Sequence, residues 1–200
     1  EGSAGELNDD QKQIVETTLD RTMYMMRLVN ELLDVTKIED QRYDLQPSLT
    51  DFSALLEQIV QDVSQAAEHK GVTFALEADE KLPKMTIDAD KVKMAISNVA
   101  DNAIKYTNKG GTVRLRTKKV GNMIEIQVQD TGVGIPEKDV YRTFSKFFRA
   151  SNAISLHTSG SGLGLYIART IAADHGGDLN FETNKGGAGT TFTLSLPLAG

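Results

Sequence analysis

The segment NVADNAIKY at residues 98–106 belongs to a predicted helix with an apolar face on one side and a polar face on the other. Asn98, Asn102 and Lys105 stand at positions i, i+4 and i+7, so a helix presents them on one side. Amide oxygens are hard ligands that suit Mg²⁺, and a lysine suits a phosphate. The alternative is an ordinary solvated helix face, and this segment alone leaves both interpretations open.

A second segment, DTGVGIP at residues 130–136, directly follows a predicted strand. A buried Asp130 at a strand end accepts a hydrogen bond from an exocyclic amine, and Gly132 and Gly134 let the backbone approach a flat ring. A tight turn without a ligand is the alternative interpretation.

A third segment, GSGLGL at residues 160–165, stands directly before a predicted helix. Glycines before a helix N-terminus favour an anion site, because free N–H groups and the helix dipole point toward the charge. The segment lacks the lysine of a P-loop, so that class of site is excluded.

Two more segments complete the series. FSKFFR at residues 144–149 lies in the long glycine-containing stretch from residue 130 to residue 164. It is either a small helix that docks its aromatic rings on the core or a lid that brings its cations to phosphates. GGAGT at residues 186–190 is explained by a glycine turn before the last strand.

Outside these segments, the patterning predicts an α+β fold: a two-layer α/β sandwich with a mixed, mostly antiparallel sheet covered by helices. A Rossmann fold is excluded, because no glycine-rich turn joins a first strand to its helix. Helices are expected over residues 8–38, from the Asp51 cap onward, over 90–106 and over 165–174. Strands are expected over residues 72–76, 83–88, 112–117, 123–129, 179–183 and 190–197.

The predicted first helix carries a wide apolar stripe, and Asn8 or Asp9 can cap it. Its apolar residues form two adjoining rows, as in a four-helix bundle. The rows are Met25, Leu28, Leu32 and Val35, and beside them Met26, Val29, Leu33 and Thr36. The helix packs either on the core of its own domain or on helices from another segment or another chain.

Composition excludes several classes of function. The 200 residues weigh 21.8 kDa, carry a net charge of −6 and have a pI near 5.1, which argues against non-specific nucleic-acid binding. The sequence has no cysteine, so disulfides, thiolate zinc sites and cysteine nucleophiles are excluded. It has no apolar run long enough to span a membrane and no signal peptide.

The segments, in this order from residue 98 to residue 190, resemble the catalytic and ATP-binding domain of bacterial sensor histidine kinases. That domain has the Bergerat fold shared with gyrase-type ATPases. LVNELLDVTKIE at residues 28–39 resembles the end of the second helix of the family's dimerisation and phosphoacceptor domain. The expected domains are a loop or cloning remnant at 1–7, an incomplete dimerisation domain at 8–40, a linker at 41–50 and the catalytic domain at 51–198.

The resemblance implies a role for each matching residue, with ATP and Mg²⁺ as ligands. Asn98 and Asn102 would hold Mg²⁺ and, through it, the phosphates, and Lys105 and Tyr106 would contact phosphate and the purine side. The implied catalytic residues are Asn98, Lys105, Lys146 and Arg149, the last two approaching the γ-phosphate from the lid. The implied nucleotide-binding residues are Asn98, Asn102, Lys105, Tyr106, Asp130, Gly132, Gly134, Ile135, Gly160, Gly162, Leu163, Gly164, Leu165 and Thr190.

The resemblance also bears on the reaction. Gyrase-like ATPases carry a glutamate at the place of Asn98, where it activates water, and an amide cannot take that proton. Transfer to a protein is therefore favoured over hydrolysis, which stays an alternative beside a degenerate nucleotide-binding module. None of the histidines, His69, His157 and His175, stands in the family's acceptor sequence, so we expect no autophosphorylation by this chain alone.

The implied partners are a response regulator receiver domain and a second kinase subunit that pairs through the bundle helices. No nucleic acid and no membrane contact by this segment are expected. The implied location is the cytoplasm, whether or not the parent protein is anchored in a membrane.

Overall fold

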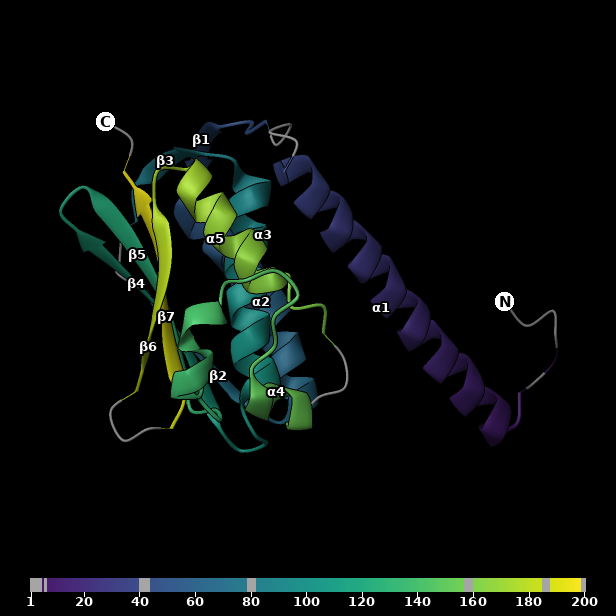
Figure 1. The fold of residues 1–200 in the computed structure, drawn as a ribbon. Helices are drawn as coiled ribbons and strands as arrows, with labels where there is room; N and C mark the ends of the chain where they lie inside the picture. Colours follow the sequence, from purple (N-terminus) through teal and green to yellow (C-terminus); the bar gives the residue numbers. More distant parts are fainter. Residues whose placement is uncertain are drawn as a thin grey trace. The chain divides into compact units, whose positions relative to one another are not determined.

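The computed structural model describes residues 5, 7–39, 44–78, 82–156, 160–184 and 188–198. The chain divides into two compact units, Glu1–Arg42 and Tyr43–Gly200, both drawn in Figure 1. The described part of the first unit contains one helix, α1 (Asp9–Glu39), and the second unit contains the strands and the other helices. No helix among these residues has the length and apolar character needed to cross a membrane.

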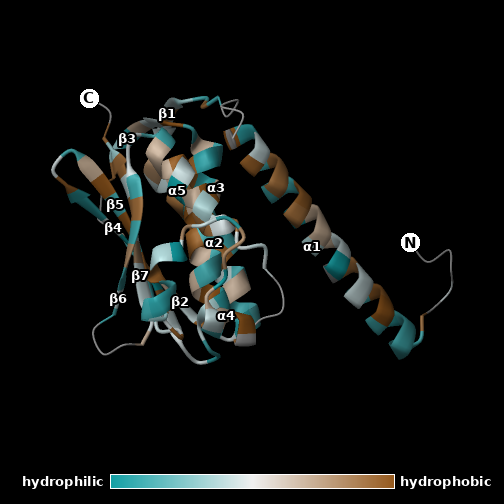
Figure 2. Ribbon diagram, in the orientation of Figure 1, coloured by the Kyte–Doolittle hydropathy of each residue, from teal (hydrophilic) through white to brown (hydrophobic). Residues whose placement is uncertain are grey.

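Helix α1 confirms the long helix predicted over residues 8–38, and a reciprocal cap starts it. Asn8 Oδ1 accepts the Gln11 N–H at 2.9 Å, and Gln11 Oε1 accepts the Asn8 N–H at 3.0 Å, which satisfies donors that the first turn leaves free. Figure 2 shows hydrophobic stretches along this helix. Its exposed apolar side chains are Ile14, Val15, Leu19, Met23, Met25, Met26, Val29, Leu32 and Leu33.

The second unit is a mixed α/β sandwich, as predicted. Its strands are β1 (Ser48–Asp51), β2 (Thr73–Glu77), β3 (Lys84–Ile87), β4 (Thr112–Val120), β5 (Met123–Asp130), β6 (Asp178–Thr183) and β7 (Thr190–Pro197). Its helices are α2 (Phe52–Lys70), α3 (Ala89–Tyr106), the short 3₁₀ helix η1 (Glu137–Arg142), α4 (Ser151–Leu156) and α5 (Gly164–Asp174).

A five-stranded sheet in the order β2-β4-β5-β7-β6 forms one layer, and helices α2, α3 and α5 cover one of its faces (Figure 1). Strand β5 shows why the covered face is apolar. Its side chains alternate between buried residues, such as Ile124, Ile126 and Val128, and half-buried polar ones, such as Gln127 and Gln129. The alternation ends at Asp130, which points a carboxylate toward the helix layer.

Polar caps fix the starts of two core helices. Asp51 accepts the N–H groups of Ser53 and Ala54 at the start of α2, which confirms the predicted cap. Asp88 caps α3 by accepting the Lys91 N–H. The helix begins at Ala89, one residue before the predicted start at residue 90. Local hydrogen bonds thus fix the residue at which each of these helices begins.

The structure corrects several predicted elements. Residues 48–50, predicted as part of a linker, form β1 together with Asp51, and this strand pairs antiparallel with β3 in a separate two-stranded sheet. The sheet is mixed, as predicted, and its parallel pair is β2 with β4, because the chain returns through α3 before it enters β4. Strand β4 extends to Val120 rather than residue 117. The long glycine-containing stretch from 130 to 164 contains two short helices that were not predicted, η1 and α4, and neither lies at residues 144–149.

Candidate nucleotide-binding site

The polar face of α3 is covered by the start of α5, so it is no ordinary solvated face. Asn98, Asn102 and Lys105 are half-buried on α3. A side chain added at Gly164 would lie 3.5 Å from Asn98 Oδ1, which shows how closely the first residue of α5 approaches the Asn98 amide. Helices α3 and α5 pack against each other along this line (Figure 1).

The glycine segment before α5 brings two cations together. A Cβ on Gly160 would collide with Lys105 Nζ and would lie 3.9 Å from Arg149 Nε. Gly160 therefore lies between a lysine of α3 and an arginine of the lid. Both positive charges face the backbone immediately before a helix N-terminus, where an anion is most stable.

The start of α5 is itself suited to an anion. Its first residues are Gly164 and Leu165, and no side chain of the described residues caps its N–H groups. The preceding Leu163 is buried, and its N–H donates to Ser161 Oγ at 3.1 Å. Leu163 thus anchors the segment in the core while the N–H groups of the first turn stay available.

Asp130 is the buried carboxylate of the site. It is 4% exposed, and its Oδ1 accepts the N–H groups of Gly132 at 2.8 Å and Thr190 at 3.2 Å. Burial raises the pKa of Asp130 to about 6, while these two hydrogen bonds act in the opposite direction. Within the described residues, Oδ2 accepts no hydrogen bond, so it is the oxygen that can read a ligand.

The first glycine segment is held against the end of α3. The Val133 N–H donates to the Tyr106 carbonyl at 3.2 Å, and a Cβ on Gly132 would collide with the same carbonyl. Gly134 has a φ of +67°, which favours glycine. Helix α4, which follows the lid segment 144–149, also contacts this loop, because Asn152 donates to the Gly134 carbonyl at 3.0 Å. Ile135, next in the loop, is half-buried.

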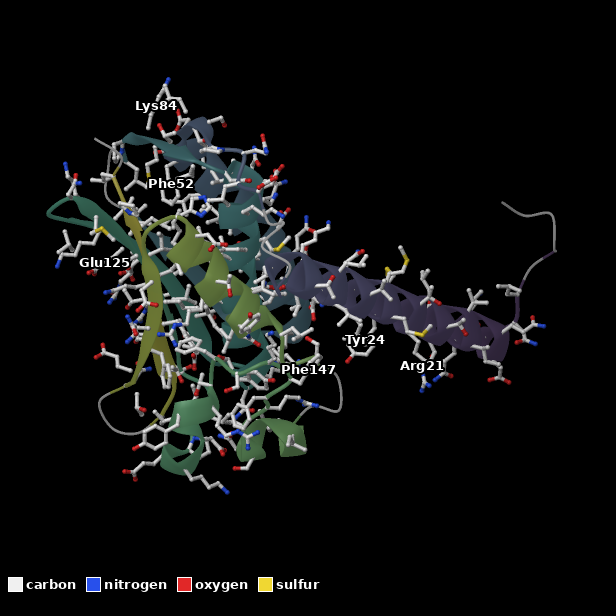
Figure 3. The ribbon with its side chains drawn as sticks, turned by 45° about the horizontal axis from the view of Figure 1, so that its top comes forward. Arg21, Tyr24, Phe52, Lys84, Glu125 and Phe147 are labelled. Carbon is white, nitrogen blue, oxygen red and sulfur yellow. The ribbon has the colours of Figure 1, made fainter. Side chains whose placement is uncertain are left out.

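The aromatic residues of the lid divide between the two predicted roles. Phe144 docks on the core, with its ring centroid 5.7 Å from that of Phe181 in β6. Phe148 lies under Arg142, whose guanidinium carbon is 4.6 Å from the ring centroid. Phe147, labelled in Figure 3, is 62% exposed and has a φ of +60°. The docked ring of Phe144 agrees with the first interpretation, in which aromatic rings pack on the core. The exposed ring of Phe147 does not pack there.

The lid cations lie near α5. Lys146 Nζ is 4.9 Å from the ring centroid of Tyr166 in the first turns of α5, and Arg149 is beside Gly160. Gly162 holds the lid backbone close, because a Cβ there would lie 2.6 Å from the Phe148 carbonyl oxygen. The predicted residues therefore gather in two groups. One surrounds the start of α5 and was predicted to contact phosphate (the phosphate side), and the other surrounds Asp130 and was predicted to contact the base (the base side).

Three residues that sequence reasoning missed support this arrangement. Lys70 Nζ donates to the Ile104 carbonyl at 2.7 Å and to the Lys105 carbonyl, so it caps the end of α3. Burial lowers the pKa of Lys70. Asn184 donates to the Asp130 carbonyl at 2.7 Å, and Asn152 holds Gly134. No local motif marks these residues, because each acts across a long stretch of sequence. The predicted turn at residues 186–190 lies partly outside the described residues.

Comparisons with known proteins agree with this geometry. The family model described as histidine kinase-, DNA gyrase B- and HSP90-like ATPase matches residues 87–200. The sensor histidine kinase WalK of Bacillus subtilis is 32% identical over 196 residues, covering 97% of this chain and 32% of WalK. The aerobic respiration control sensor protein ArcB of Escherichia coli is 29% identical over 194 residues, covering 96% of this chain and 25% of ArcB. The chain thus spans a third or less of the length of these relatives.

Solved structures show the same fold. Full-length ShkA in complex with AMPPNP has a TM-score of 0.81 and 26% identity, covering 99% of this chain and 41% of ShkA. The histidine kinase ThkA in complex with the response regulator protein TrrA has a TM-score of 0.72 and 20% identity, covering 98% of this chain and 54% of ThkA. At that identity the second likeness concerns the fold alone.

Proposed function

The chain belongs to the family of histidine kinase-, DNA gyrase B- and HSP90-like ATPases, and from this premise we propose that it is the ATP-binding catalytic part of a sensor histidine kinase. The reaction is transfer of the γ-phosphoryl group of ATP to a histidine on a bundle helix. Asn98, which lies against the first residue of α5, is the observation that favours transfer over hydrolysis, because its side chain is an amide and not an acid.

The base side of the site fits adenine. The exocyclic amine of adenine donates hydrogen bonds, and Asp130 Oδ2 is an acceptor without another hydrogen bond in the described part of the chain. A guanine ring carries a carbonyl oxygen at the corresponding place, and that oxygen would face the carboxylate without a proton between them. Gly132 packs directly on the end of α3, because a Cβ there would collide with the Tyr106 carbonyl, and this contact holds the loop beside Asp130.

The phosphate side fits a triphosphate. Lys105 and Arg149 meet at Gly160, and the first turn of α5 offers uncapped N–H groups. With Lys146 on the same side, these groups orient the γ-phosphate and neutralise the charge that spreads over its oxygens during transfer.

Mg²⁺ fits this donor set only together with a nucleotide. Asn98 and Asn102 offer neutral amide oxygens on one half-buried face of α3, and Mg²⁺ prefers oxygen ligands that include substrate phosphates. The ion would neutralise phosphate charge and tie the phosphates to α3. The two asparagines would hold it in place, and without phosphate oxygens they are too few to bind it firmly.

The transfer step itself needs little from the protein beyond position and charge. A lone pair on an imidazole nitrogen attacks the γ-phosphorus, the bond to the β–γ bridging oxygen breaks, and ADP leaves with that electron pair. The imidazole then loses its extra proton to solvent. Since Asn98 cannot accept a proton from water, it gives hydrolysis no general base.

The acceptor histidine, in this proposal, is none of the three in the sequence. Both ring nitrogens of His175 are engaged: Nε2 accepts the Asp88 N–H at 3.1 Å, and Nδ1 lies 2.8 Å from the Ile171 carbonyl. His69 stands in the last turn of α2, and His157 lies outside the described residues.

The exposed apolar stripe of α1 supports a bundle role for residues 8–40, and the catalytic domain then includes β1, which pairs with β3. Pairing of that stripe with other bundle helices would join two subunits. The partner that receives the phosphoryl group from the histidine is a response regulator receiver domain, the class of protein found with ThkA.

Labelled ATP tests the reaction. The chain is incubated with γ-labelled ATP and Mg²⁺, alone and in a version preceded by a helix with the family's acceptor sequence. We expect no sustained phosphate release from the chain alone and label on the added histidine in the longer version. Sustained phosphate release without any acceptor would show a hydrolase, and binding without label in the longer version would show a degenerate module.

A further inference from the structure

Asn184 connects two strands that do not pair with each other. It directly follows β6, and its Nδ2 donates to the carbonyl of Asp130, the last residue of β5, at 2.7 Å. Strand β7 lies between β5 and β6 in the sheet. Asn184 Oδ1 accepts the Thr191 hydroxyl at 2.7 Å, so both ends of the amide are satisfied as the side chain crosses the start of β7.

The residue directly before β7, Gly189, leaves space for this amide. Gly189 has a φ of +81°, and a Cβ on it would collide with the Asp130 carbonyl oxygen and would lie 2.8 Å from Asn184 Nδ2. The Asn184 N–H also donates to the Gly189 carbonyl at 3.3 Å. A glycine is therefore required at residue 189 by its own conformation and by the neighbouring side chain.

The amide replaces a hydrogen bond that the sheet cannot make. Pairing of β5 with β7 ends at Gln129 and Thr191. One residue further, the Thr190 N–H donates to the Asp130 side chain instead of a main-chain carbonyl. The carbonyl of Asp130 then needs another donor, because buried main-chain groups without partners are costly, and Asn184 supplies it.

We propose that Asn184 is a positioning residue that fixes Asp130 for base recognition and so sets the preference for adenine over guanine. The inference rests on the proposed function. Three donors act on Asp130: Gly132 and Thr190 hold Oδ1, and Asn184 holds the main chain from which the side chain projects. Together they aim Oδ2. Loss of the Asn184 contact frees the main chain and moves the one oxygen that reads the base.

The effect of Asn184 on binding is therefore expected to depend on the base. Phosphate contacts belong to α3, α5 and the lid, none of which Asn184 touches through a described hydrogen bond. A residue with a merely structural role would weaken all nucleotides equally. A positioning residue for the base lowers the ratio of adenine to guanine affinity.

The test compares dissociation constants for non-hydrolysable ATP and GTP analogues with Mg²⁺. Asn184→Asp keeps the acceptor for Thr191 and removes the donor to Asp130. The matched control is Asn180→Asp, which makes the same charge change at an exposed site of β6. We expect N184D to lower the ATP-to-GTP affinity ratio about five- to tenfold, the value of one hydrogen bond, and N180D to leave the ratio unchanged.

A second variant separates the inference from effects of charge and folding. Asn184→Ala removes the donor without adding a negative charge and should lower the ratio in the same direction. An unchanged ratio in both variants, or loss of folding in N184A, would overturn the positioning role. Failure of the unaltered chain to bind either analogue would instead overturn the proposed function.

Discussion

The side-chain carboxylate of Asp130 accepts the main-chain N–H of Thr190 at 3.2 Å, across 60 residues of sequence. This bond joins the end of β5 to the start of β7 and leaves the second carboxylate oxygen to a ligand. Asp130 is only 4% exposed, so its carboxylate is a buried charge. The buried charge therefore lowers the stability of the free chain, whereas recognition of the base uses it.

Replacement of Asp130 by asparagine should stabilise the free chain. The folded pKa of about 6 lies above the ordinary value of 3.8, so the folded state binds more protons between these values and its stability falls as pH rises through 6. At pH 7.5 the variant Asp130→Asn should be about 1–3 kcal/mol more stable. The difference should vanish near pH 4. Urea denaturation at both values measures it, and a destabilised variant at pH 7.5 would contradict the account.

Binding of adenine nucleotides should weaken in acid. A protonated Asp130 carries its proton on the oxygen that must accept from the amine, so affinity should fall about tenfold for each unit of pH well below 6. Calorimetric titrations with an ATP analogue and with ADP between pH 5 and 8 check this. Both should show the same fall because they share the base. A fall confined to the triphosphate would place the titrating group on the phosphates.

Lys70 should stabilise the end of α3 and with it the site. Its ammonium group donates to the carbonyls of Ile104 and Lys105, so Lys70→Met should cost about 1–3 kcal/mol, the value of hydrogen bonds to a charged group. It should also weaken nucleotide binding. The matched control is Lys93→Met, which removes an ion pair with the exposed Asp62 and should cost less than about 1 kcal/mol. Thermal denaturation compares the two, and equal losses would refute the capping role.

A side chain at residue 162 should displace the lid. Gly162 has a φ of +74°, and its Cβ would lie 2.6 Å from the Phe148 carbonyl oxygen. Gly110 has a φ of +84° with open space around it, so Gly110→Ala carries the backbone strain without the collision. Gly162→Ala should reduce nucleotide affinity at least about tenfold, while Gly110→Ala should reduce only stability. The same affinity in both variants would show that the lid tolerates displacement.

The helices and turns that depend on local interactions were predicted from local patterns in the sequence. The three core helices and the hairpin of β4 and β5 follow from periodicity and capping, and Asp51 caps α2 as predicted. Strand β1 was missed because its four residues are mostly exposed and show no alternation of buried and exposed positions, unlike those of β3. The parallel pairing of β2 with β4 was missed because it joins segments on either side of α3, and no local pattern reports such pairing.

The same distinction applies to the site. The glycine and asparagine segments marked its residues, because each has a local signature. Lys70, Asn152 and Asn184 carry none, since their hydrogen bonds join residues 18 to 54 positions apart. The solvated face considered for α3 is wrong, because α5 covers Asn98. This contact depends on how α3 and α5 pack, so the sequence pattern of neither helix alone predicts it.

Nucleotide binding through Asp130 is measured by a calorimetric titration of the chain with a non-hydrolysable ATP analogue and Mg²⁺ at pH 7.5. The same titration is made on Asp130→Asn and on the control Asp62→Asn, which changes an exposed carboxylate of α2. The account predicts saturable binding to one site, at least about tenfold weaker in D130N and unchanged in D62N. No binding by the unaltered chain, or equal binding by all three proteins, would contradict it.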